Sequence, residues 1–158
     1  MKQFRKILLV LDPEAQRQPA LERAAGLARQ HGASLHVLTV LEDLPLELKM
    51  LLSAPHPGEL RENIEQQRLA LRQQGLDRLL ENPSLAGVQR HLLLGPPEQV
   101  IPQIAEREGI ELIVMGTVAR TGIPGLLIGN TAERILDGVA CDVLTIKPEG
   151  FITPVTLI

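Results

Sequence analysis

The segment Ile7-Leu8-Leu9-Val10-Leu11, close to the start of the chain, is five aliphatic residues in a row and ends at Asp12. A strand with one face in water alternates apolar and polar residues, whereas a strand covered on both faces is apolar nearly throughout. Four later segments have the same character, at residues 35–41, 88–94, 112–115 and 143–146. The sequence therefore predicts five strands that are buried within one sheet.

The segments between these apolar runs have helical periodicity. Residues 19–31, 58–81, 97–108 and 130–138 carry apolar residues at helical spacing. Alternation of strands and helices is typical of a parallel α/β sheet, in which right-handed crossovers place helices on both faces. The 158 residues are enough for one ordinary domain. We expect an open five-stranded parallel sheet of the Rossmann-like type.

Glycine and asparagine mark several helix ends. Gly32 and Gly109 follow two of the predicted helices, at the position where glycine commonly ends a helix. Asn130 and Glu133 have the spacing of a capping box, so the last helix is predicted to begin at Asn130. The proline-containing residues 42–57 are expected to form an irregular or mobile connection.

Composition excludes several classes of protein. Hydrophobic residues make up 44% of the chain and charged residues 22%, which excludes a wholly disordered chain. The net charge is −3 and Trp and Tyr are absent, so the charge and the stacking rings of a nucleic-acid-binding protein are missing. The first apolar run is too short for a signal peptide or a membrane span. The single cysteine, Cys141, fits a reducing compartment, so we expect a cytoplasmic protein. From the charge, the missing rings and the short apolar run, we expect that it binds neither nucleic acid nor a membrane.

The carboxyl ends of the predicted strands are where a parallel sheet binds ligands. The first strand ends at Asp12, the second near Val40, and the fourth at Met115. Met115 leads into residues 116–131, which hold four glycines in fourteen residues before a predicted helix. Glycines of this kind bring backbone N–H groups close to an anion, although they also serve simply to make turns.

This glycine-rich segment matches neither common nucleotide-binding loop. No Gly-x-Gly-x-x-Gly follows the first strand, and no Gly-x-x-x-x-Gly-Lys-Ser/Thr occurs in the chain. The spacing resembles that of the universal stress protein family, whose nucleotide-binding members carry Gly-x-x-Gly, a longer interval, and then Gly-Ser/Thr. Gly116 matches the first glycine, Ala119 the second, Gly129 the third and Asn130 the Ser/Thr position.

Further matches extend the resemblance over essentially the whole chain. They are Ile7 to Asp12, Glu111 to Gly116, and Cys141 to Pro148. Arg120-Thr-Gly-Ile-Pro-Gly and Gly129-Asn-Thr-Ala-Glu look like the E-type branch of the family, which often has two tandem domains where this chain has one.

The resemblance implies a homodimeric cytoplasmic stress protein with a fold similar to the adenine-nucleotide α-hydrolases. It implies that residues 1–148 form the family's domain, and that ATP, with or without Mg²⁺, is the cofactor. Asp12 and Val40 would border the adenosine, and Met115 and Gly116 would line it with backbone. The residues implied to face or flank the phosphates are Thr117, Ala119, Arg120, Gly129, Asn130 and Thr131.

Two positions depart from the family's pattern. Ala119 adds a methyl group where the family has glycine, and Asn130 can cap a helix with the side chain that Ser or Thr would direct to a phosphate. These departures keep a second hypothesis open, a dimeric scaffold that binds a protein partner or a lipid-like ligand. No general base or nucleophile is evident in the sequence, so any ATP hydrolysis is expected to be slow.

The remaining candidate residues and the end of the chain give further expectations. The four histidines, at positions 31, 36, 56 and 91, are expected to be surface or strand-edge residues, and Cys141 a packing residue. The fifth strand is expected to be an edge strand that pairs antiparallel with a second copy. The apolar tail, residues 149–158, is expected to pack on that dimer partner.

Overall fold

The computed structural model describes residues 2–11, 19–41, 57–81, 83–116, 130–147, 150–152 and 155. Strands and helices alternate along these residues, as predicted. The strands are β1 (Lys6–Val10), β2 (Ser34–Leu41), β3 (Gln89–Leu94), β4 (Leu112–Gly116) and β5 (Asp142–Ile146). The helices are α1 (Pro19–His31), α3 (Pro57–Leu79), a 3-10 turn (Pro83–Leu85), α4 (Pro97–Glu108) and α5 (Asn130–Leu136).

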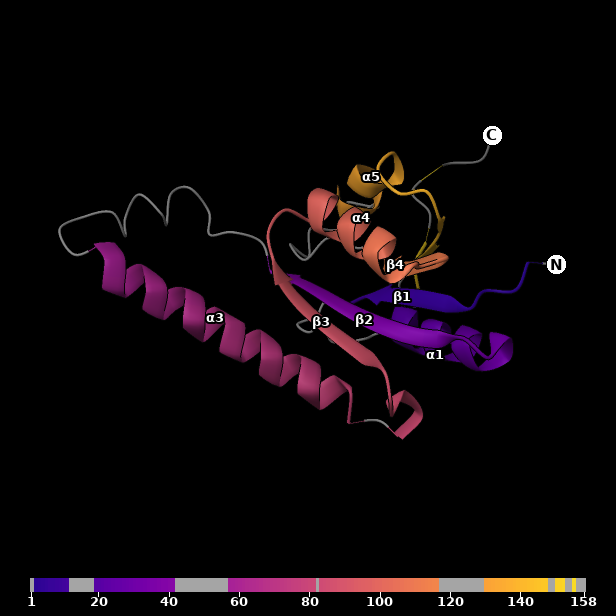
Figure 1. The fold of residues 1–158 in the computed structure, drawn as a ribbon, viewed down its shortest axis with the longest axis horizontal. Helices are drawn as coiled ribbons and strands as arrows, with labels where there is room; N and C mark the ends of the chain where they lie inside the picture. The colour runs from indigo at the N-terminus through magenta and orange to yellow at the C-terminus, as the bar shows by residue number, and fades with distance from the viewer. Residues whose placement is uncertain are drawn as a thin grey trace.

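The five strands form one parallel sheet in the order β3-β2-β1-β4-β5 (Figure 1). This confirms the predicted five-stranded α/β fold and the predicted edge position of β5. The connections through α1 and α3 move outward from β1 in one direction, whereas those through α4 and α5 run the other way. Because such crossovers are right-handed, the two pairs of helices lie on opposite faces of the sheet.

Two apolar cores follow from this arrangement, one on each face. Ile7 and Leu9 of β1 point into the core that α1 covers, and Leu8 between them points into the core that α4 and α5 cover. All three side chains are fully buried. Each contributes about 1.5–3 kcal/mol when it is removed from water, so the central strand stabilises both layers.

Helix α3 lies differently from the other helices. Figure 1 shows it extending along β3 and out beyond the end of the strand. The side chains of residues 62–71 are exposed or half-buried, whereas Leu76 and Leu80 are buried in the core on the α1 face. The apolar spacing of this segment predicts the helix correctly, but among its described side chains those buried against the sheet lie in the last third of the helix.

Two predicted helix ends are confirmed. Gly32 and Gly109 have φ angles of 61° and 68°, values that glycine adopts without strain. The Gly109 N–H donates to the carbonyl oxygen of Glu106 (3.2 Å), which ends α4. The last helix begins at Asn130 as predicted, and it ends two residues earlier than expected, because the Gly138 N–H turns back to the carbonyl oxygen of Ile135 (2.9 Å). The connection predicted at residues 42–57 lies, up to residue 56, outside the described residues.

No helix among the described residues is both long and apolar enough to cross a membrane.

Candidate functional site

The order of the strands places a topological switch point at the carboxyl ends of β1 and β4, the place where open α/β sheets hold ligands in a crevice. These strands are neighbours, with Val10 opposite Met115, but the chain leaves them toward helices on opposite faces of the sheet. In an open α/β sheet the backbone diverges at such a switch point and leaves room for a ligand. The switch point is therefore the candidate site, and it lies where the sequence analysis expected a ligand.

Three of the predicted site residues border this edge. Val40 and Met115 are 6% and 3% exposed and belong to the core beneath α4 and α5. Gly116 is the last residue of β4 and lies opposite Ile146 of β5. A side chain at Gly116 would meet no described atom within 4 Å. Packing among the described residues thus gives no reason for a glycine at this position.

A buried hydroxyl that the sequence analysis did not single out helps to position this edge. Thr39 is fully buried, and its Oγ1 donates to the carbonyl oxygen of Leu11 (3.2 Å). The Leu11 N–H donates in turn to the carbonyl oxygen of Leu38 (2.9 Å). These two bonds hold the residue before Asp12 against β2. A hydroxyl between the aliphatic residues Leu38 and Val40 is the signal by which Thr39 could have been found.

The side chains of the other predicted site residues are not described by the structure. Asp12, Thr117, Ala119, Arg120 and Gly129 lie outside the described residues. Asn130 and Thr131 form the first turn of α5, and only their backbone is described. The roles assigned to these seven residues stay predictions.

The titratable residues outside the crevice are partly as expected. Cys141 is half-buried against the core beneath α4 and α5, and burial raises the pKa of its thiol. The expectation that the histidines are surface or strand-edge residues is wrong for His36, which is 1% exposed on the inner strand β2. The described residues contain no group of three or more His, Cys, Asp or Glu side chains that could hold a metal ion.

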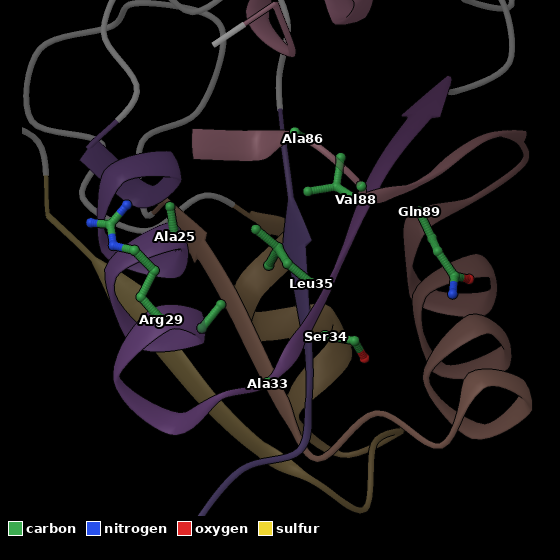
Figure 2. A pocket seen from close by; sticks show the side chains of 10 residues that line it. Ala25, Arg29, Ala33, Ser34, Leu35, Ala86, Val88 and Gln89 are labelled. Carbon is green, nitrogen blue, oxygen red and sulfur yellow. The ribbon is translucent and has the colours of Figure 1, made fainter. Parts of the chain in front are cut away.

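A hollow of about 240 Å³ lies at the opposite, amino end of the sheet. Figure 2 shows Ala25 and Arg29 of α1 on one side of it, Val88 and Gln89 on the other, and Leu35 between them. Leu35 and Gln89 are at the starts of β2 and β3, so the hollow is separate from the candidate site at the carboxyl ends of the strands.

Residues 3–147 match the model of the Universal stress protein family. The chain belongs to the universal stress protein family. This universal stress protein is 33% identical to Universal stress protein E of Salmonella typhi over 123 residues, which are 78% of this chain and 38% of that protein. The matches span 21% to 38% of the length of E-type relatives from Escherichia coli and Salmonella typhi.

Solved structures share the fold. The hypothetical protein MJ0577 superposes with a TM-score of 0.76 at 20% identity, covering 95% of this chain and 100% of that chain. A universal stress protein in complex with cAMP superposes with a TM-score of 0.59 at 18% identity, covering 92% of this chain and 98% of that chain. The Rossmann-like α/β fold is thus common to this universal stress protein and both structures.

Proposed function

We propose that this universal stress protein binds ATP in the crevice between the carboxyl ends of β1 and β4. The observation that carries the proposal is Gly116, a glycine at the mouth of the crevice with no described atom within 4 Å of where its side chain would be. Such a position lets a ligand approach the backbone closely. The neighbour in complex with cAMP, an adenine nucleotide on the same fold, supports this choice of ligand.

The proposed roles follow the positions along the edge. Val40 and Met115 form an apolar floor from the core side, and Gly116 offers backbone to the adenosine. Asp12 accepts hydrogen bonds from the ribose or helps to hold Mg²⁺, for which carboxylate oxygens are suited. The phosphates lie against residues of the following loop and the start of α5, namely Thr117, Ala119, Arg120, Gly129, Asn130 and Thr131.

The proposed activity is binding and release of the nucleotide rather than rapid turnover. Rapid hydrolysis needs a group that positions or activates the attacking water. Asp12 is the one acidic residue among the proposed ligands, and its assigned role is binding. We propose that the protein acts in the cytoplasm as a stress-response module whose state follows the nucleotide.

The test uses the absence of Trp and Tyr, because the chain itself absorbs little at 280 nm. A purified sample that carries a nucleotide has a strong band at 260 nm, and nucleotide-free protein is then titrated with Mg-ATP in a calorimeter. Gly116→Val should abolish the binding heat while the fold is kept, since valine suits a strand. Gly26→Ala, in α1 with open space around it, is the matched control and should bind as the unaltered protein does. Unchanged binding by folded Gly116→Val would contradict the site.

We also propose that the protein is a homodimer joined through β5. This strand is an edge of the sheet, and Val143, Leu144 and Ile146 are only half-buried within one chain. Antiparallel pairing with the same strand of a second copy would extend the sheet beyond this edge and cover these side chains.

A second candidate function is a scaffold that binds a protein partner or a lipid-like ligand without nucleotide. It is favoured by large apolar side chains that remain exposed near the end of the chain. Ile152 is 86% exposed and Val155 is 66% exposed. A flat 260 nm region and no heat with Mg-ATP, together with a stable dimer, would favour this candidate over the nucleotide-binding function.

A further inference from the structure

Two histidines on neighbouring strands contact one another inside the sheet. His36 of β2 is 1% exposed, and His91 of the edge strand β3 is half-buried. The His36 Nδ1 and the His91 Nε2 are 3.2 Å apart, and the two rings are parallel within 2°. The other nitrogen of His36, Nε2, is buried and has no hydrogen-bond partner among the described atoms.

The positions of the hydrogen atoms in the neutral pair follow from this contact. Two neutral imidazoles carry two N–H hydrogens, and one of them must lie between His36 Nδ1 and His91 Nε2 to make a hydrogen bond. If His91 donated, the hydrogen of His36 would be on Nε2, a buried donor without an acceptor. Such donors are rare in proteins because their desolvation is not compensated. The neutral pair therefore has His36 donating from Nδ1 to His91 Nε2.

Adding one proton to the pair makes this arrangement of ring hydrogens impossible. Three hydrogens must then occupy the four ring nitrogens, and the two nitrogens that face each other cannot both carry one without repulsion. The empty nitrogen is therefore one of these two. His36 Nε2 must carry a hydrogen in either case, and it has no acceptor. Uptake of a proton thus costs the pair a buried, unpaired N–H whichever ring carries the charge.

Burial and the groups around His36 together lower its pKa. Lys6 of β1, Glu108 of α4 and His91 of β3 act on this pKa. Burial, and then the neighbouring His91, lower the pKa of His36 below its ordinary value of 6.5; Glu108 opposes this change more than Lys6 adds to it. The hydrogen-bond geometry and the burial of His36 therefore agree that this ring resists protonation in the folded chain.

Strand β3 is attached to the sheet through its pairing with β2, from Gln89 opposite His36 to Leu94 opposite Leu41. It is the outer strand, paired with β2 alone, and its side chains are all exposed or half-buried. The ion pair from Arg90 of β3 to Asp77 of α3 measures 2.8 Å but is about half exposed, so it stabilises the strand little. Of the contacts that attach β3, the one between His36 and His91 is the contact that proton uptake disrupts.

We propose that His36 and His91 form a proton-sensitive contact that holds β3 against β2 when both rings are neutral and releases it as the pair is protonated. His36 takes up a proton near pH 6.5 when it is unfolded or detached, and at lower pH in the folded chain. The open form therefore binds more protons between these two values, and the stability of β3 falls as the pH falls through this window. The proposal does not depend on nucleotide binding.

Hydrogen exchange of the backbone amides tests the proposal. Protection factors of β3 amides, corrected for the intrinsic effect of pH on exchange, should fall by up to about tenfold per pH unit below pH 6.5, whereas those of β1 should change less. His36→Asn keeps an N–H donor near the position of Nδ1 but cannot be protonated, so its β3 protection should be nearly independent of pH. His31→Asn, in α1 and away from β3, is the matched control and should behave as the unaltered protein does.

A second measurement reads the hydrogen positions directly and needs no variant. Nitrogen-15 spectra of the histidine rings at pH 7.5 should show the hydrogen of His36 on Nδ1 and a bare Nε2. A hydrogen on His36 Nε2 at that pH would overturn the proposal. So would β3 protection that stays constant from pH 7.5 to 5, or a folded His36→Asn protein that loses protection as the unaltered protein does.

Discussion

The attachment of α3 to the sheet gives a quantitative prediction. Leu76 is fully buried in the core on the α1 face, whereas Leu71, five residues earlier on the same helix, is 68% exposed. Leu76→Ala removes apolar contacts and leaves a cavity, which costs about 2–5 kcal/mol at a fully buried site. Leu71→Ala loses little buried area and places the best helix former at that position, so its cost is below about 0.5 kcal/mol.

Urea unfolding at one fixed protein concentration measures both variants. With a slope of about 2 kcal/mol per molar urea, Leu76→Ala should lower the midpoint by about 1–2.5 M, and Leu71→Ala should leave it almost unchanged. Equal midpoints for the two variants would refute the reasoning, because the helix would then be held by contacts other than those near its carboxyl end.

Three further predictions concern the nucleotide and the dimer. Gly129→Val should abolish ATP binding in a folded protein and Ala119→Gly should keep or tighten it, as measured by calorimetry; a clear loss with Ala119→Gly would show that the loop is misaligned with the family's pattern. Asp12→Ala should weaken ATP binding by about 1–3 kcal/mol, the value of a charge-assisted contact; unchanged affinity with a lower melting temperature would assign Asp12 to a structural role. Truncation after Pro148 should shift the protein toward monomer in light scattering at micromolar concentration, and an equally tight dimer would exclude a role for the tail.

The strands could be predicted from the sequence because their signal is local. Ile7 to Leu11 is apolar at every position, and this pattern survives in any arrangement that buries both faces of the strand. The end of β4 was predicted at Met115, one residue before its observed end at Gly116, because the apolar run stops where the glycine-rich segment begins. The position of the candidate site at the carboxyl ends of the strands also followed from the strand directions alone.

Features that depend on pairing between distant segments were not predictable in this way. The contact between His36 and His91 requires β2 and β3 to be neighbours with His36 opposite Gln89 and His91 opposite Leu38. A shift of the register by one residue would place the two rings on opposite faces. The outward extension of α3 was missed for a related reason, because periodicity indicates that a helix has an apolar side but not how much sheet lies beneath it.

The central place of β1 has a consequence for synthesis of the chain. One side of β1 pairs with β2, but the other side pairs with β4, with Ile7 opposite Leu112. At about 5–20 residues per second, the strand made first waits on the order of ten seconds before its second neighbour exists. During that interval Ile7, Leu8 and Leu9 belong to a sheet that still has an open side. The central strand of the finished sheet is therefore the one of the five that spends longest exposed on the ribosome, and chaperones that bind aliphatic segments would meet it first.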